Sequence, residues 1–162
     1  MNVHEYRFHY IDGANMPLEF WDGQPILLVN TASECGYTPQ YRKLQRLWED
    51  YRQSQLVVLG LPCNDFGAQE PGTDEKIAAW VREEFGVTFP LTRKIHILGQ
   101  EAHPLFLDLR DEYGDEILPR WNFTKYLFDG DGRLVERWPS KVEPDDPTLT
   151  HAVERNLRAW IV

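Results

Sequence analysis

The sequence predicts an α/β fold in which helices cover both faces of a central sheet of mixed strand direction. Two continuous apolar runs, residues 25–30 and 56–61, are typical of strands buried on both faces. An amphipathic helix separates them, so strand, helix and strand form a βαβ unit with parallel strands and a right-handed crossover. A hairpin pattern over residues 123–138 predicts two further, antiparallel strands.

The first half of the chain adds an N-terminal hairpin to this unit. Residues 3–10 alternate weakly between apolar and polar side chains and end at Asp12-Gly13, a turn signal. We expect the helix of the βαβ unit to begin at Pro39 with Thr38 as its cap, because the first helical position needs no N–H. Its apolar residues recur at helical spacing: Tyr41, Leu44, Leu47, Trp48 and Tyr51.

The second half predicts three helices and the C-terminal hairpin. One helix covers residues 74–85, between a cap at Thr73 or Asp74 and the stop signal Gly86, and a short one begins near Pro104. Strands 123–128 and 134–138 flank an Asp-Gly-Asp-Gly turn. The last helix opens at Pro147, and its apolar side comprises Leu149, Val153, Leu157 and Trp160. This order is a thioredoxin-like layout with additions, in a single domain over residues 1–162.

The composition excludes several classes of function. The chain has 42% hydrophobic residues, a composition typical of globular proteins. Its formal net charge of −9 makes it too acidic to neutralise nucleic-acid phosphates. No apolar run is long enough for a membrane span, and the first residues lack the features of a signal peptide. We therefore expect a cytoplasmic protein. The scattered histidines show no metal-ligand spacing with each other or with Cys35 and Cys63.

Cys35 is the candidate reactive residue. It follows the carboxyl end of a central strand, where α/β folds bind their ligands, and precedes a helix N-terminus. Free N–H groups and partial positive charge at such a terminus favour a thiolate over a thiol. Thr38 stands where a thiol–disulfide exchanger carries its second cysteine, so the sequence favours attack on an O–O bond to give a sulfenic acid. A buried, inert cysteine is the alternative.

Three segments resemble the signatures of the glutathione peroxidase family, in the same order and spacing. They are Asn30 to Tyr41 around Cys35, Leu59 to Gly72 around Gln69, and Trp121 to Lys125. The similarity extends from about Pro25 to the C-terminus. It implies a thioredoxin-like fold. We expect no prosthetic cofactor, because the sequence contains no phosphate loop and no flavin fingerprint.

The resemblance also implies a catalytic set of four residues. Cys35 would be the peroxidatic thiol, Gln69 and Trp121 would donate side-chain N–H groups to it, and Asn122 would be the fourth member. An amide and an indole are neutral donors at any physiological pH, so they can stabilise a thiolate and the charge that develops as the O–O bond breaks.

The chain departs from the family pattern at two places. Many cysteine-type members carry a resolving cysteine where this chain has Val81 or Arg82, so a two-cysteine cycle is unsupported. Cys63 is the one other thiol, and the resemblance implies a structural role, because the family's cysteine at this position is usually not the resolving one. If the two strand ends were adjacent, Cys63 could still reach Cys35, and a bridge would require Cα atoms within about 7 Å. Asp65 replaces a glutamine that is usual in the family, and we expect its carboxylate to point away from Cys35.

The reductant and the assembly state follow only from the resemblance. The stretch between Asp108 and Arg120 is shorter than in tetrameric members, which implies a monomer with an open site. An external thiol, glutathione or thioredoxin, would regenerate Cys35. Basic residues that could bind the anionic glutathione are Arg42, Lys43, Arg120, Lys125 and Lys141.

The sequence therefore predicts a thiol peroxidase that reduces hydrogen peroxide and organic hydroperoxides through a Cys35 sulfenic acid. Two alternatives remain open at this point. A peroxide sensor or relay would pass the oxidation of Cys35 to a partner protein, and the absent resolving cysteine favours it. A non-catalytic binding module with this fold is the other alternative, which the complete set of four residues disfavours.

Overall fold

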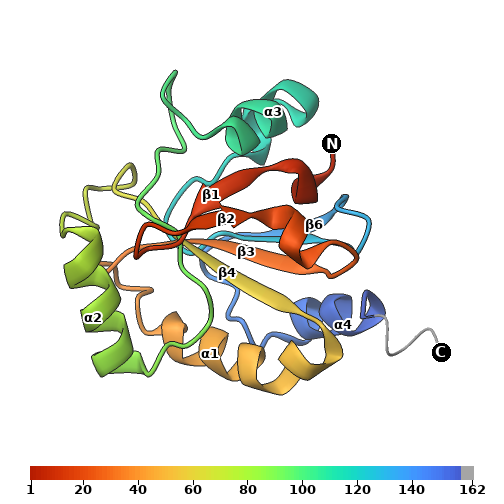
Figure 1. Cartoon of the computed structure of the whole chain (residues 1–162), viewed down its shortest axis with the longest axis horizontal. Coiled ribbons are helices and arrows are strands. Elements are labelled where there is room, and N and C mark those ends of the chain that lie inside the picture. Colours follow the sequence, from red (N-terminus) through yellow and green to blue (C-terminus); the bar gives the residue numbers. More distant parts are fainter. Residues whose placement is uncertain (158–162) are drawn as a thin grey trace.

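The computed structural model describes residues 1–157 and is built around a four-stranded sheet in the order β4-β3-β5-β6 (Figure 1). The strand β3 (Ile26–Thr31) pairs in parallel with β4 (Val57–Pro62). On its other side β3 pairs antiparallel with β5 (Lys125–Phe128), and β5 pairs antiparallel with β6 (Leu134–Trp138). The predicted parallel βαβ unit, C-terminal hairpin and mixed sheet are therefore confirmed.

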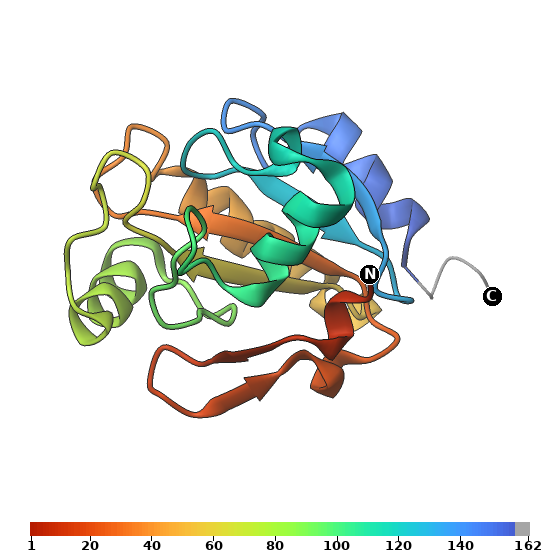
Figure 2. The same cartoon turned by 90° about the horizontal axis from the view of Figure 1, so that it is seen from above.

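Helices cover both faces of this sheet, as predicted. On one face lie α1 (Gln40–Tyr51), α2 (Asp74–Phe85) and α4 (Pro147–Arg155). On the other lie α3 (Pro104–Tyr113) and the hairpin of β1 (Arg7–His9) and β2 (Asn15–Pro17) (Figure 2). Short 3-10 helices are at Val3–Glu5, Leu18–Trp21, Arg52–Ser54 and Asp115–Ile117. Within residues 1–157, no helix has the length and apolar character that crossing a membrane requires.

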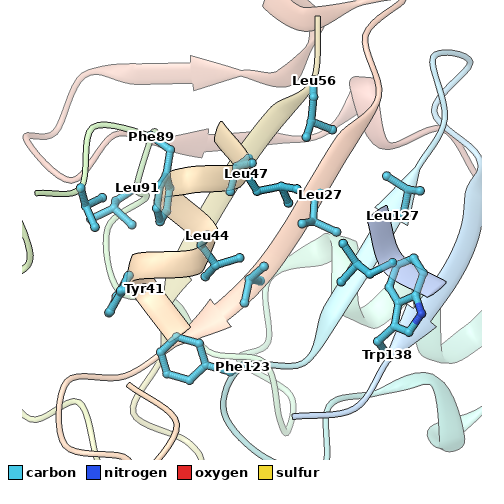
Figure 3. Close-up of a cluster of buried hydrophobic side chains, with 14 of the residues drawn as sticks. Leu27, Tyr41, Leu44, Leu47, Leu56, Phe89, Leu91, Phe123, Leu127 and Trp138 are labelled. Carbon is cyan, nitrogen blue, oxygen red and sulfur yellow. The ribbon is translucent and has the colours of Figure 1, made fainter. Parts of the chain in front are cut away.

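The central strand β3 is buried along its whole length because it contributes to two cores. Leu27 and Val29 belong to the core under α1, which also contains Leu44 and Leu127 (Figure 3). Alternate residues of the same strand belong to the core under α3. Side chains of a strand point alternately to its two faces, so a strand covered on both sides is apolar at most of its positions. This explains the uninterrupted apolar runs in the sequence.

The structure corrects some predicted element boundaries. Residues 3–5 form a 3-10 helix instead of the start of a strand, and the first strand of the hairpin begins at Arg7. Helix α1 begins at Gln40, and the Thr38 side chain does not cap it. Phe123 has a φ of 64°, which no strand residue adopts, so β5 begins two residues later than predicted. The predicted place of Trp160 in the last helix lies outside the described residues.

Lys125 is a lysine inside the sheet, with no exposed surface. Its Nζ donates hydrogen bonds to the carbonyl oxygens of Ser140 and Val142, which hold the loop after β6. Burial lowers the pKa of Lys125 from 10.5 to about 7, although the nearby Glu143 carboxylate opposes the shift. A protonated ammonium is therefore less stable here than in the unfolded chain.

We expect Lys125→Met to change how stability depends on pH. Between about pH 7 and 10 the unfolded lysine keeps a proton that the folded one releases, so the stability contributed by Lys125 rises with pH. The wild-type free energy of unfolding, minus that of the variant, should then increase by about 1.4 kcal/mol per pH unit across this window. Urea titrations at several pH values measure this difference, with the exposed Lys141→Met as control. A difference that does not change with pH would contradict the burial effect.

Candidate active site

The loop between β3 and α1 holds Cys35 in a defined geometry. The Cys35 N–H donates to Thr38 Oγ1 at 3.0 Å, and the Thr38 hydroxyl donates to the Ala32 carbonyl at 2.8 Å. Thr38 therefore closes the loop, which is why it is not free to cap α1. The Tyr37 N–H donates to Cys35 Sγ at 3.4 Å, and 7% of Cys35 is exposed. A backbone donor aimed at the sulfur favours its anionic form.

Gln69 and Asn122, which are far apart in the sequence, meet beside this loop. Asn122 Nδ2 donates to Gln69 Oε1 at 3.0 Å and to the Phe66 carbonyl at 3.2 Å. The Gln69 carbonyl in turn accepts the N–H groups of Ser33 and Glu34, at 3.2 and 3.0 Å. The structure thus joins the Cys35 loop, Gln69 and Asn122 by hydrogen bonds. With Oε1 engaged by Asn122, the Gln69 NH₂ group is oriented away from that partner and free to donate elsewhere.

Trp121, which precedes Asn122 in the chain, packs its indole directly against Gly67. A Cβ atom at Gly67 would lie 2.5 Å from Trp121 Cη2, and Gly67 has a φ of +73°. Only glycine satisfies both conditions at this position. The Gly67 turn therefore permits the approach of the segment that carries Gln69 to the segment that carries Trp121.

Asn30 is a positioning residue that sequence reasoning missed. Its carbonyl accepts the Phe123 N–H at 2.7 Å, and its Oδ1 accepts the Thr124 N–H at 3.0 Å. Its Nδ2 donates to the Trp121 carbonyl at 3.1 Å. These bonds fasten the Trp121–Asn122 segment to the end of β3. A polar residue that ends an otherwise apolar strand was the available signal, since a buried amide must be paired.

Cys63 lies on the opposite side of the sheet from Cys35. Cys35 packs in the core with α1 and α2, whereas Cys63 packs in the core with α3. Both cysteines are unpaired. Cys63 is fully buried, and burial raises the pKa of its thiol to about 12. A thiol that is neutral and separated from Cys35 by the sheet fits the structural role expected for Cys63.

The Asp65 side chain binds the loop of residues 96–98. Its carboxylate accepts the N–H groups of Ile97 and Leu98 at 2.7 and 3.0 Å, and His96 Nδ1 lies 2.9 Å from it. Burial alone would raise the pKa of Asp65, but these partners outweigh it and hold the pKa below its usual value. These partners lie in the loop of residues 96–98, which agrees with the expectation that the Asp65 carboxylate points away from Cys35.

The basic residues that are candidates for binding glutathione lie in different environments. Lys125 is wrong as a candidate, because it is buried and bonded to two carbonyls. The Arg42 guanidinium lies over the Phe85 ring at 4.8 Å, and Lys43 pairs with Asp145 and Glu143. Arg120 and Lys141 are exposed. Within residues 1–157, no group of three or more His, Cys, Asp or Glu side chains is placed to hold a metal ion.

Known proteins share both the fold and the sequence. The crystal structure of Trgpx in apo form superposes with a TM-score of 0.76 at 31% identity, over 96% of this chain and 95% of that one. A thiol:disulfide interchange protein from Chlorobium tepidum superposes at 0.64 with 14% identity over 96% and 97% of the two chains, and this shows the fold alone. The thioredoxin-like fold is therefore confirmed.

Curated relatives are similar along most of the chain. A glutathione peroxidase homolog of Halalkalibacterium halodurans is 42% identical over 89% of this chain and 93% of its own length. A hydroperoxy fatty acid reductase of Synechocystis is 40% identical over 89% and 90%, respectively. A glutathione peroxidase-like peroxiredoxin of Schizosaccharomyces pombe is 41% identical over 83% and 86%.

The fold, the cysteine site and these relatives define a thioredoxin-fold thiol peroxidase, an oxidoreductase that reduces hydroperoxides. Residues 3–110 match the glutathione peroxidase family, and the chain belongs to that family. The matched range includes Cys35 and Gln69, whereas Trp121 and Asn122 follow it.

Proposed function

We propose that Cys35 is the peroxidatic residue of this enzyme and that Gln69, Trp121 and Asn122 support it. The hydrogen bond from the Tyr37 N–H to Cys35 Sγ, on a loop tied to Gln69, is the observation that carries the proposal. Gln69 and Trp121 would turn their N–H groups to the sulfur when peroxide is bound. Asn122 would orient Gln69 by holding its Oε1 atom.

In the first step the Cys35 thiolate attacks one oxygen of the hydroperoxide and the O–O bond breaks. The sulfur is oxidised by two electrons to a sulfenic acid, and the leaving oxygen takes a proton and departs as water or an alcohol. Neutral N–H donors around the sulfur stabilise charge that spreads over the breaking O–O bond.

In the second half of the cycle an external thiol reduces the sulfenic acid. One thiol displaces hydroxide, which leaves as water with a proton, and forms a mixed disulfide with Cys35. A second thiol cleaves this disulfide, releasing the oxidised reductant and the Cys35 thiolate. The position of Cys63 across the sheet supports direct reduction, since a Cys35–Cys63 disulfide would require rearrangement of the core. We propose glutathione or thioredoxin as this thiol, in a cytoplasmic monomer.

Peroxide-dependent NADPH oxidation, coupled to glutathione and thioredoxin recycling in parallel, tests this proposal. Turnover with glutathione and its reductase is expected if the cycle uses direct reduction. Turnover with thioredoxin alone would mean that the protein reductant acts on the sulfenic acid or on a rearranged disulfide.

The separation of the two cysteines also favours one alternative, the peroxide relay. A relay would show fast oxidation of Cys35 by intact mass but no turnover in either coupled system. Light scattering tests the proposed monomer.

A further inference from the structure

A cluster of buried polar side chains adjoins the Cys35 loop, and the proposed mechanism uses none of its members. Both carboxyl oxygens of Glu70 and the hydroxyls of Thr31, Ser33 and Tyr41 are buried without a hydrogen-bond partner. Glu70 lies beside Ser33, and Tyr41 lies close to Thr31 and Glu70. Buried polar atoms in folded proteins are normally paired, so this gathering of unpaired atoms requires an explanation.

The backbone of Glu70 is fixed to its surroundings at both ends. Its N–H donates to Asn64 Oδ1 at 2.9 Å, and its carbonyl accepts from Lys94 Nζ at 3.2 Å. The preceding carbonyl, that of Gln69, receives the amides of Ser33 and Glu34. Glu70 is therefore linked to the loop that carries Cys35 through the hydrogen bonds of the adjoining Gln69 carbonyl.

The charged groups around Glu70 do not stabilise an ionised carboxylate well. Lys94 is the neighbouring cation that favours ionisation, but it already bonds to the Glu70 main chain, and Glu34 on the Cys35 loop opposes ionisation. A cavity of about 490 Å³ adjoins the site and is lined by Lys76 and Glu83 of α2, whose charges offset each other. Burial raises the pKa of Glu70 to about 7, and the nearby Ser33 hydroxyl and amide oppose the rise.

We propose that Glu70 is a positioning residue of the peroxidatic site, whose neutral carboxyl holds the Cys35 loop in its reactive geometry and whose ionisation slows the attack on peroxide. The inference rests on the proposed role of Cys35. A neutral carboxyl fits beside the hydroxyls of Ser33 and Tyr41, whereas a buried carboxylate without partners draws in water or new donors. A second negative charge beside the loop also opposes the Cys35 thiolate.

The pH profile of Glu70→Gln tests this role, because glutamine mimics the neutral carboxyl at every pH. The rate constant for oxidation of Cys35 by hydrogen peroxide is measured in single turnover by quenched-flow intact mass. The ratio of variant to wild-type rate constants should rise about tenfold or more between about pH 6 and pH 8.5, since Glu70 ionises in this range. A merely structural role would change the rate constant by the same factor at every pH.

Two further variants keep the test decisive. Glu34→Gln removes an exposed carboxylate of the same loop that opposes the ionisation of Glu70, so the alkaline loss of rate should move to lower pH. Ser33→Ala removes a hydroxyl that lowers the pKa of Glu70, so the alkaline loss of rate should move to higher pH. A flat ratio for Glu70→Gln, or, if that variant does not fold, an unmoved profile for Ser33→Ala, would overturn the inference. If Cys35 resists oxidation at every pH, the proposed function itself fails instead.

Discussion

Replacing Cys35 by serine is expected to lower peroxide turnover at least about a thousandfold. A serine hydroxyl is not ionised at neutral pH. The Tyr37 amide, which donates to Cys35 Sγ, cannot act as a base that would remove the hydroxyl proton. The substitution leaves the hydrogen bonds of the loop in place, because Thr38 and Gln69 bind its backbone. NADPH-coupled turnover, together with a circular dichroism spectrum that shows the fold is retained, measures the effect.

Cys63→Ala is the matched control for this variant. Cys63 is a neutral thiol in the other core, so its replacement should cost about 1 kcal/mol of stability through lost packing and leave turnover at the wild-type level. Loss of turnover in the Cys63 variant, with Cys35 still oxidised by peroxide, would show that Cys63 resolves the sulfenic acid. Retention of turnover in the Cys35 variant would exclude Cys35 as the peroxidatic residue.

The parts of the fold that could be predicted are those encoded by local pattern. The two apolar runs predicted the parallel strands, because a strand covered on both faces is apolar at most of its positions. Helix α2 was predicted to the residue, since Thr73 accepts the Lys76 N–H and Gly86 adopts a φ of 62° at its end. Both signals act within one turn of the helix, and the Thr73 hydroxyl is engaged by the helix itself.

Other features depend on contacts between distant segments and left no local signal. Thr38 has the chemistry of a helix cap, but the carbonyl of Ala32 and the amide of Cys35 engage its hydroxyl instead. Lys125 was a candidate to bind glutathione, yet two carbonyls of a later loop accept hydrogen bonds from its Nζ inside the sheet. In each case the competing partner is known only once the chain is folded.

The residues of the candidate site could be predicted from the sequence, but the hydrogen bonds that connect them could not. Cys35 could be chosen from its place between a strand and a helix. Gln69, Trp121 and Asn122 came from the family resemblance, because as single residues they resemble a turn, a core aromatic and a cap. The bond between Asn122 and Gln69, and the support from Asn30, appear only in the structure. These bonds supply a physical reason for the joint occurrence of the residues.

Trp121→Phe is expected to lower the rate constant for Cys35 oxidation about a hundredfold, the usual effect of losing one donor to a developing negative charge. Phenylalanine keeps an aromatic ring but removes the indole N–H together with the outer ring atoms that face Gly67, and the backbone carbonyl of Trp121 still binds Asn30. The measurement is single-turnover oxidation by hydrogen peroxide, because the donor acts in that step. Reduction of the preformed sulfenic acid by thiol should change much less, so the two half-reactions separate the donor role from a general distortion of the site.

Trp138→Phe is the control for the loss of an indole, because Trp138 is buried in the core and its Nε1 has no hydrogen-bond partner. Its replacement removes the same atoms at a place without contact to peroxide, and it should reduce stability while the oxidation rate stays at the wild-type level. If Trp121→Phe also oxidises at the wild-type rate, the indole N–H has no part in the transition state. Catalysis would then depend on the Tyr37 amide and Gln69, and Trp121 would serve to pack the Gly67 turn against the site.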